Sequence, residues 1–580
     1  MSVEQIDAGH SQNNLISMDM TLKYARGISY SQLYKDKKDT IEMLVKDLPT
    51  CESVMWLSFL VHQKITLTVK QAEIQIMAPL LFQFNSDLQH RILNFIGGRT
   101  FSTDQFLDLQ SLLKMIEYLL QRHNSYRREL GKNDKSNLFK AYLIVCDDYL
   151  VQKKEVNQDG TYSADDMLKF YMPFKLRMNT VLRIKDSLIE MVKSKLFLDD
   201  FASNNQRFSS YIDAYIRGKH CESVSKYMLM LFSLSAELIC NEKKTNIIKI
   251  DLSDSATMCS FLDNFCINVP DNIDDVNIQE KPLYKVDHNT YCFLYIKFFV
   301  DKFFHSLLFD LAKELENQRL IDTKKTPAYV QIKQLVGQKF TEQYLFYKVI
   351  DRILADKRYE KKTGEDMSKI SDGLPDFYAN KGQRVFLFEF KDIQLNKEVV
   401  TSGVYDTIIR ATEKELVENE KGRPKGITQL VNDIDKHLAD IVGKDRVSEK
   451  LYVYPILVYS DSSFDIEGFN YYLNNRFHEI IRTRNIPSNI HVKDVLMVNI
   501  DTLIMFEKAF TDKKLKFDVL INEYISYKNS KEQYQVVPFN KFLFQKAKQK
   551  GCYYKASYLV NEMIAEMVEK EKNEKETYER

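Results

Sequence analysis

The chain has 580 residues, which is too long for one compact core and suggests about three to four domains. Its 82 Lys and Arg residues balance 81 Asp and Glu residues, which excludes a histone-like or coat-like protein that holds nucleic acid through a global basic field. Only 17 Gly and 11 Pro residues occur, so we expect long regular elements, mostly helices.

The chain shows no sign of disulfides, of a zinc site or of membrane attachment. Its eight cysteines form no CxxC pair and lie mostly in apolar runs, which indicates buried free thiols in a reducing compartment. Residues 1–14 have neither a basic start nor an apolar run, so we expect no secretory signal. Charged residues at Lys297, Asp301 and Lys302 interrupt the most apolar stretch, 291–312. These features favour a cytoplasmic protein that does not contact a membrane.

Residues 1–325 are predicted to form a mainly helical region. Apolar residues recur every three or four positions in 39–48, 106–123 and 179–197, which is typical of amphipathic helices. Turn-rich breaks at 131–137 and 156–166 divide the region into two subdomains near 131–165, and Ser163 is the expected N-cap of the next helix. A strand beginning at Asn246 and a hairpin around 287–289 follow. Such a region could sense a trigger, bind a protein partner or drive self-association.

The pattern changes after residue 325. Residues 334–354 are predicted to form a helix, 355–372 a charged loop, 373–392 a hairpin and 427–442 an amphipathic helix. Two apolar strands are expected at 451–461 and 495–504. This order of elements indicates an α/β domain over 326–510, with a mixed sheet flanked by helices. Residues 511–580 are predicted to be a helical C-terminal extension.

The hairpin at 373–392 contains the most unusual residues of the chain. Because side chains alternate along a strand, four residues share one face of its second strand: Val385, Leu387, Glu389 and Lys391. A two- or four-residue loop centred on Lys381 and Gly382 would place Asp376 opposite Leu387, on the Glu389 face. The two acids would then be diagonal neighbours, roughly 7–8 Å apart. Two carboxylates at that separation can share a Mg²⁺ ion, and a lysine beside them can stabilise charge that develops on a phosphate.

Pro375-Asp376 followed by Glu389-Phe390-Lys391 resembles the signature of the PD-(D/E)xK (restriction-endonuclease-like) nuclease superfamily. The resemblance extends to an acid on the preceding helix, Glu342, and to a glutamine on the following helix, Gln429. It implies that Asp376, Glu389 and Glu342 bind Mg²⁺, for which Mn²⁺ can substitute. It also implies that Lys391 serves catalysis and that Gln429 contacts the substrate near the scissile phosphate.

By this resemblance the chain is expected to be a metal-dependent nuclease that cleaves DNA and leaves a 5′-phosphate, with a role in prokaryotic genome defence. Three alternatives stay open. The domain could be an inactive nuclease fold that binds nucleic acid or serves as a scaffold, or the substrate could be RNA. The hairpin could also be an ordinary edge whose Glu and Lys are solvated. Basic residues that could contact phosphate occur in three stretches: 348–362, 421–425 and 540–555.

Overall fold

The computed structural model describes residues 26–35, 39–66, 74–97, 104–105, 107–150, 164–166, 168–169, 172–173, 175–176, 186–240, 246–250, 255–267, 277–371, 373–552 and 557–578. The predicted N-cap Ser163 lies outside these residues. The chain forms two compact units. The first is drawn from Met1–Thr161, Val181–Ser187 and Tyr215–Leu307, and the second from Tyr162–Thr180, Leu188–Ala214 and Leu308–Arg580. The units do not follow the predicted boundaries at 325/326 and 510/511, because segments on both sides of each boundary belong to the second unit.

The first unit is mainly helical. Its larger helices are α3 (Thr50–Thr66), α4 (Ile74–Leu81), α5 (Ser86–Gly97), α6 (Leu109–Gln121), α7 (Lys132–Leu150), α12 (Val224–Cys240) and α13 (Ser255–Asp263). Shorter helices are α1 (Tyr30–Leu33), α2 (Ile41–Val45) and α14 (Ile296–Asp301), and β1 (Arg26–Gly27) pairs in parallel with β2 (Asp104–Gln105). The apolar faces of α3, α6 and α7 meet in a core that contains Trp56, Leu112 and Phe139.

The hairpin predicted around 287–289 is confirmed in the first unit. Its strands are β4 (Leu283–Lys285) and β5 (Thr290–Phe293), which pair antiparallel. The strand predicted from Asn246 is β3 (Ile247–Lys249), and it pairs with the other edge of β5. The resulting three-stranded order is β3-β5-β4.

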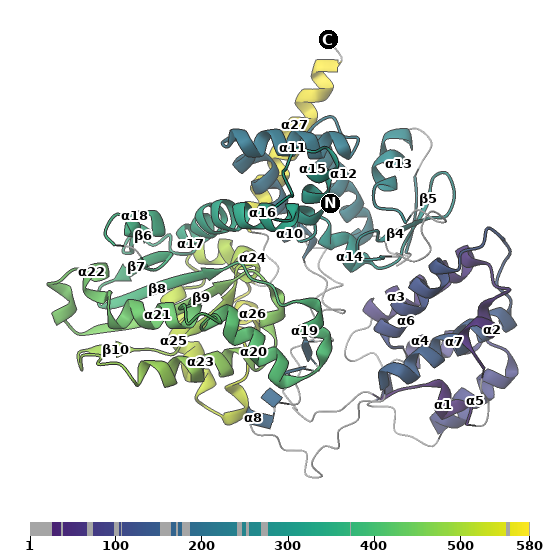
Figure 1. The fold of residues 1–580 in the computed structure, drawn as a ribbon, viewed down its shortest axis with the longest axis horizontal. Helices are drawn as coiled ribbons and strands as arrows, with labels where there is room; N and C mark the ends of the chain where they lie inside the picture. Colours follow the sequence, from purple (N-terminus) through teal and green to yellow (C-terminus); the bar gives the residue numbers. More distant parts are fainter. Residues whose placement is uncertain are drawn as a thin grey trace. The chain divides into compact units, whose positions relative to one another are not determined.

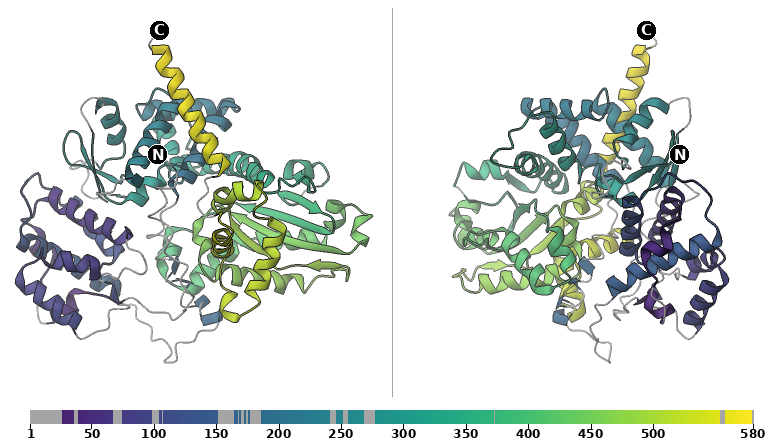
Figure 2. Two further views of the ribbon diagram at one scale, coloured as in Figure 1. Left: turned by 180° about the vertical axis from the view of Figure 1, so that it is seen from behind. Right: turned by 45° about the vertical axis from the view of Figure 1, so that its right-hand side comes forward.

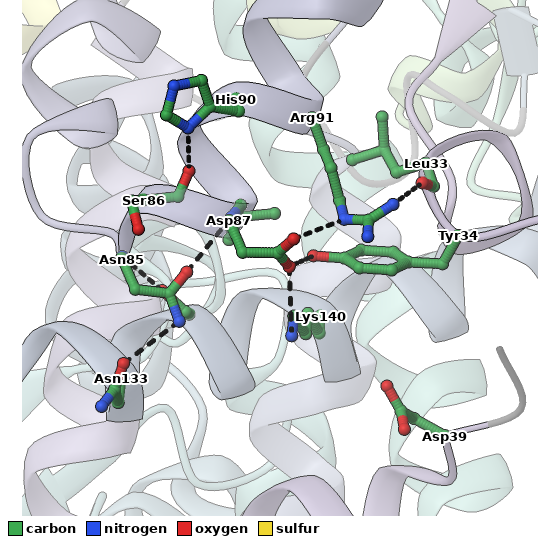
Figure 3. Close-up of polar contacts among 12 residues, drawn as sticks. Leu33, Tyr34, Asp39, Asn85, Ser86, Asp87, His90, Arg91, Asn133 and Lys140 are labelled. Carbon is green, nitrogen blue, oxygen red and sulfur yellow. Dashed lines mark hydrogen bonds and ion pairs between the residues drawn. The ribbon is translucent and has the colours of Figure 1, made fainter.

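A polar network centred on Asp87 joins the end of α1 to α5 and α7 (Figure 3). Arg91 donates from Nε to Asp87 Oδ1 over 3.0 Å and from Nη1 to the Leu33 carbonyl over 3.1 Å. Tyr34 donates its hydroxyl to Asp87 Oδ2 over 3.4 Å, and Lys140 Nζ lies 4.0 Å from the same oxygen. Because each of these groups has a partner on a neighbouring segment, the network is explained as a structural tie between helices.

The second unit is built around a mixed six-stranded sheet, visible with its flanking helices in Figure 1 and from behind in Figure 2. The main strand order is β10-β9-β8-β7-β6, and β11 also pairs with β9. The strands are β6 (Glu360–Thr363), β7 (Phe377–Lys381), β8 (Arg384–Lys391), β9 (Leu451–Tyr459), β10 (Ile490–Val492) and β11 (Leu496–Asn499). The pairs β6-β7 and β7-β8 are antiparallel, whereas β9 runs parallel to β8, β10 and β11.

Both faces of β8 are buried, as its nearly unbroken apolar sequence predicts. On one face Val385 and Leu387 join a core that includes Leu430 and Ile434 of α21 (Gly426–Asp435). That core also takes residues from α20 (Tyr405–Leu416), α22 (Leu438–Val442) and α23 (Phe469–Ile481). On the other face Phe388 stacks on Phe517, the first residue of α25 (Phe517–Lys528), with ring centroids 6.1 Å apart.

Two predicted segments differ from the structure. The charged loop at 355–372 contains β6 and the short helix α18 (Gly364–Ser368), which a Thr363 capping box begins. The strand predicted at 495–504 ends at Asn499, where α24 (Ile500–Thr511) begins. The Asn499 side chain accepts a hydrogen bond from the Asp501 N–H and so caps this helix. In each case a polar residue, Thr363 or Asn499, caps a helix that begins inside a run of charged or apolar residues. The composition of the run does not reveal that boundary.

The C-terminal residues belong to the second unit and do not form a separate extension. They form α25, α26 (Phe539–Gln549) and α27 (Tyr558–Tyr578). Arg352 of α17 (Tyr347–Ile353) donates to Glu562 of α27 over 2.8 Å and lies 3.4 Å from Glu507 of α24. From earlier in the chain, α10 (Ser187–Lys195) and the π-helix η4 (Leu196–Phe201) also join this unit, and Phe197 packs on Phe340.

The remaining helices of the second unit are α8 (Ala164–Asp166), α11 (Gln206–Gly218), α15 (Leu307–Asn317), α16 (Ala328–Val336) and α19 (Lys397–Ser402). Helix α11 begins in the second unit and ends in the first, whereas α15 begins in the first unit and continues into the second. The helix predicted at 334–354 is present as the end of α16, a ten-residue π-helix η5 (Gly337–Phe346) and α17. A π-helical stretch is rare and often occurs at functional sites.

Candidate active site

The β7–β8 hairpin turns through two residues. Lys381 pairs with Arg384, so the turn consists of Gly382 and Gln383. Gly382 has a φ of +62°, which a tight hairpin turn of this length requires and which glycine adopts without strain. A two-residue loop is one of the two predicted lengths. Its centre lies between Gly382 and Gln383, one residue later than the predicted centre at Lys381 and Gly382.

This register relates the two signature acids across the hairpin. Phe377 pairs with Phe388 in the last pair of the ladder, so the same register continued by one residue beyond the strand would set Asp376 opposite Glu389. The prediction that Asp376 lies opposite Leu387 is therefore wrong by two residues. Because side chains repeat every second residue, the two-residue difference keeps Asp376 on the Glu389 face. The charge of Asp376 raises the pKa of Glu389, so the two carboxyl groups lie within electrostatic reach of each other.

The hairpin brings Asp376, Glu389 and Lys391 together through direct contacts. The Phe390 N–H donates to Asp376 Oδ2 over 2.7 Å, which fixes the aspartate against the strand that carries the other two residues. Lys391 Nζ donates to Glu389 Oε1 over 2.5 Å. Glu389 is 1% exposed, and the Lys391 side chain is 18% exposed. An acidic pair and a lysine are thus held on one rigid, mostly dehydrated face of the sheet.

Burial and the neighbouring charges shift the pKa of all three groups. Burial raises the pKa of Asp376, against the opposing effects of Lys391 and the Phe390 N–H. Burial and the charge of Asp376 raise the pKa of Glu389, although Lys391 opposes them. Burial lowers the pKa of Lys391, but Glu389 and Asp376 more than offset it, so this pKa is raised overall. The lysine therefore stays charged while the carboxyl groups resist losing their protons.

Glu342 approaches the same site from the π-helix η5. Burial and the charge of Asp376 raise its pKa to about 7, with Lys391 and Lys339 opposing. Next to it, Thr341 donates its hydroxyl to the Gly337 carbonyl over 2.6 Å. The structure thus places Glu342 within electrostatic reach of Asp376 and Lys391. It was predicted as a member of this site from its position on the preceding helix.

Tyr347 is a neighbour of the site that sequence reasoning missed. Burial and then the charges of Asp376 and Glu342 raise its pKa. Its hydroxyl lies 2.7 Å from the point where a Cβ at Gly364 would stand, and the Asp376 carbonyl lies 3.0 Å from that point. Only glycine fits between them. No local sequence signal distinguishes this tyrosine from the many other aromatic residues of the second unit.

Helix α21 lies over the Glu389 face of the sheet. Its first residue, Gly426, comes so close that a Cβ there would lie 3.0 Å from Leu457 Cδ1 and 3.8 Å from Lys391 Cε. Gln429 is half-buried on the same face of α21, three residues further along. Asp433 follows one turn later and is 1% exposed. The sequence predicted a site residue at Gln429 but not at Asp433, because an acid in a helix is usually solvated.

Asp433 completes a group of acids that a cation would suit. Burial and the charges of Glu389 and Asp376 raise the pKa of Asp433 to about 9, against the opposing charge of Lys391. The charge of Asp376 thus raises the pKa of Glu342, Glu389 and Asp433 by repulsion, while the Lys391 ammonium group lowers the pKa of all four acids. Oxygen ligands of this kind suit Mg²⁺, and a divalent cation would relieve the repulsion. In the part of the chain that the structure describes, no three His, Cys, Asp or Glu side chains are yet arranged to hold a metal ion.

Several of the basic residues near the site already have acidic partners. Arg352 contacts Glu507 and Glu562, and Arg358 lies 2.5 Å from Asp356. These ion pairs compete with contacts to phosphate. Lys421 and Arg423, which precede α21, are exposed.

A cavity of about 980 Å³ lies away from the carboxylates. Arg384, Tyr452 and Tyr454 line it together with residues of α25 and α26. Arg384 pairs with Tyr452 in the register that pairs Glu389 with Leu457. Because the difference of five positions is odd, these side chains point to the opposite face of the sheet from Glu389. The cavity is therefore not part of the candidate active site, although Lys546 of the predicted basic stretch 540–555 lines it.

No helix within the described ranges is long and apolar enough to cross a membrane. No protein-family model, curated protein or solved structure matches this chain.

Proposed function

We propose that the second unit is a nuclease of the PD-(D/E)xK type that uses Mg²⁺ to hydrolyse phosphodiester bonds in DNA. The observation that carries the proposal is that β8 holds all three residues together: its Phe390 N–H donates to Asp376, and Lys391 contacts Glu389. Glu342 on the preceding helix and Gln429 on the following helix support it. These elements surround one face of a mixed sheet flanked by helices, as the proposed nuclease fold requires.

In this proposal Asp376, Glu389 and Glu342 are the residues that would hold a divalent cation, which would supply positive charge next to the scissile phosphate. Lys391 stays protonated and stabilises the negative charge that develops on the phosphate. Its ammonium group also limits the repulsion between the acids when no cation is bound. Gln429 is half-buried near the N-terminus of α21 and would contact the substrate next to the scissile bond.

Cleavage of three substrates tests the proposal: supercoiled plasmid, linear duplex DNA and single-stranded RNA, each with Mg²⁺ or Mn²⁺. We expect wild type to cut DNA and Lys391→Met to be slower by about 100-fold or more, since it lacks the charge at the phosphate. Lys397→Met is the matched control, because Lys397 is an exposed lysine six residues further along. Equal cutting by Lys391→Met and wild type would refute the role of Lys391. Cutting of RNA alone would change the substrate to RNA.

The second candidate is an inactive nuclease fold that binds nucleic acid or acts as a scaffold. One observation favours it: among the described residues no three potential ligands are positioned to hold an ion. A titration with Mn²⁺ separates the two candidates. Binding that Asp376→Asn weakens supports the nuclease, whereas a wild-type protein that neither binds Mn²⁺ nor cuts supports the scaffold.

For the cellular role, we infer from the family resemblance a part in prokaryotic genome defence, in which the first unit senses a trigger, binds a protein partner or drives self-association. Bacterial cells that produce wild type or Lys391→Met would be challenged with bacteriophage. Protection by wild type alone is the expected result. Equal survival of both cultures would argue against the role.

A further inference from the structure

Asp433 is a buried acid on α21 whose side chain has, among the described residues, no hydrogen-bond partner that would explain its burial. It is 1% exposed, and neither of its carboxylate oxygens has a hydrogen-bond partner within the described part of the chain. Buried carboxylates are normally paired, because burying a charge without a partner costs several kcal/mol or shifts the group to its neutral form. The residue also lies in the last turn of α21, close to the negative end of the helix dipole. Burial without a hydrogen-bond partner and the helix dipole therefore both disfavour the charged form of Asp433.

Asp433 lies on the face of α21 that covers the signature residues. Gly426, Gln429 and Asp433 follow at intervals of three and four residues, so they share one face of α21. Gly426 on that face approaches Lys391, with 3.8 Å between the Cβ position and Lys391 Cε. The charged groups that act on Asp433 are Glu389, Asp376 and Lys391. All three belong to the β7–β8 hairpin, so Asp433 faces the site across the helix–sheet interface.

The buried apolar side chains of α21 serve the core. Leu430, Val431 and Ile434 pack with Val385 and Leu387 of β8. An apolar residue at 433 would suit this interface if packing alone mattered. A bound cation would therefore explain why a carboxyl group without a hydrogen-bond partner lies at this buried position.

We propose that Asp433 is a further ligand of the divalent cation held by Asp376 and Glu389, either directly or through a bound water. This inference rests on the proposed nuclease site and extends it with a residue outside the signature. The donor is a hard carboxylate oxygen, so the ligand class is Mg²⁺ or Mn²⁺. Four acids from three elements, η5, the β7–β8 hairpin and α21, would then surround the ion.

Calorimetric titration of the full-length protein with Mn²⁺ tests this inference, with thermal unfolding measured in EDTA and in Mn²⁺. For Asp433→Asn we expect a dissociation constant at least 10-fold higher than that of wild type. We also expect a higher melting temperature in EDTA at pH 9 and above, where wild-type Asp433 loses its proton and carries a buried charge that asparagine does not. Asp433→Glu, which keeps the carboxylate, should recover part of the affinity. Asp440→Asn is the matched control, since Asp440 is exposed on the next helix.

The possible results separate the two proposals. If Asp433→Asn folds and binds Mn²⁺ as tightly as wild type, Asp433 is not a ligand, whether or not wild type cuts DNA. If wild type binds Mn²⁺ and Asp433→Asn binds it weakly, the inference holds even when no nucleic acid is cut. If wild type neither binds Mn²⁺ nor cuts, the inference and the proposed function both fail. A loss of folding in Asp433→Asn with full binding in Asp433→Glu would still identify the carboxylate as the required group.

Discussion

The backbone N–H of Phe390 donates a hydrogen bond to Asp376 Oδ2 over 2.7 Å. Phe390 lies between Glu389 and Lys391, so the aspartate is held by the same strand segment that carries the other two signature residues. One carboxylate oxygen is committed to this bond, which orients the group on the sheet face. The hairpin thus ties the aspartate to the strand that carries Glu389 and Lys391.

Because of this bond, two substitutions can distinguish the role of the Asp376 charge from the role of its hydrogen bond to Phe390. In Asp376→Asn the side-chain carbonyl can still accept from Phe390, so we expect a folded protein with a melting temperature at or above that of wild type in EDTA. Mn²⁺ binding should weaken at least 10-fold, because the anionic oxygen is lost. Asp376→Ala should lose about 1–2 kcal/mol of stability, since the buried N–H loses its partner. Equal stability of the two variants would contradict this role of the hydrogen bond.

The stability of the metal-free protein should depend on pH. Burial raises the pKa of Glu342 to about 7 and that of Asp433 to about 9, and it also raises that of Asp376. The folded state therefore keeps protons that the unfolded chain has released, so the free energy of unfolding should fall as pH rises from about 5 to about 9. Asp433→Asn should reduce this slope by up to about 1.4 kcal/mol per pH unit.

Urea unfolding in EDTA at five pH values measures the slope, with Asp440→Asn as the control that should match wild type. Parallel slopes for wild type and Asp433→Asn would show that Asp433 has an ordinary pKa in the folded protein.

Arg352 should matter for stability rather than for nucleic-acid binding. It contacts Glu507, which is fully buried, and Glu562 on α27. Arg352→Ala would leave Glu507 without its cation, so we expect a loss of about 2 kcal/mol in the free energy of unfolding. Lys357→Ala, at an exposed position in the same basic stretch, should leave stability unchanged. Urea unfolding and a DNA-binding titration would be run side by side. Weaker DNA binding by Arg352→Ala at full stability would reverse this assignment.

The C-terminal segment should be required for the sheet to fold. Phe517 is 2% exposed and stacks on Phe388 of β8. Phe517→Ala should therefore cost about 3–5 kcal/mol, the usual range for a buried phenylalanine. Val519→Ala, two residues along the same helix, should cost less than about 0.5 kcal/mol, because Val519 is 39% exposed. A small effect at Phe517, or a stable nuclease unit truncated after residue 510, would show that the segment is an independent extension.

The sequence by itself determined the features that depend on local periodicity. Alternation along a strand put Glu389 and Lys391 on one face, and a glycine at the turn predicted the hairpin that returns Asp376 to that face. The spacing of apolar residues predicted the helices that carry Glu342 and Gln429. These relationships hold over about 20 residues or within one element, so the chain's own geometry fixes them.

Only the tertiary structure decided the relationships between distant segments. The burial of Asp433 depends on how α21 packs over β8, and the place of Phe517 depends on a contact between residues more than 100 positions apart. The same holds for the parallel pairing of β8 with β9 and for the entry of η4 into the second unit. The physical reason is that an apolar face specifies that it will be buried but not which segment will cover it.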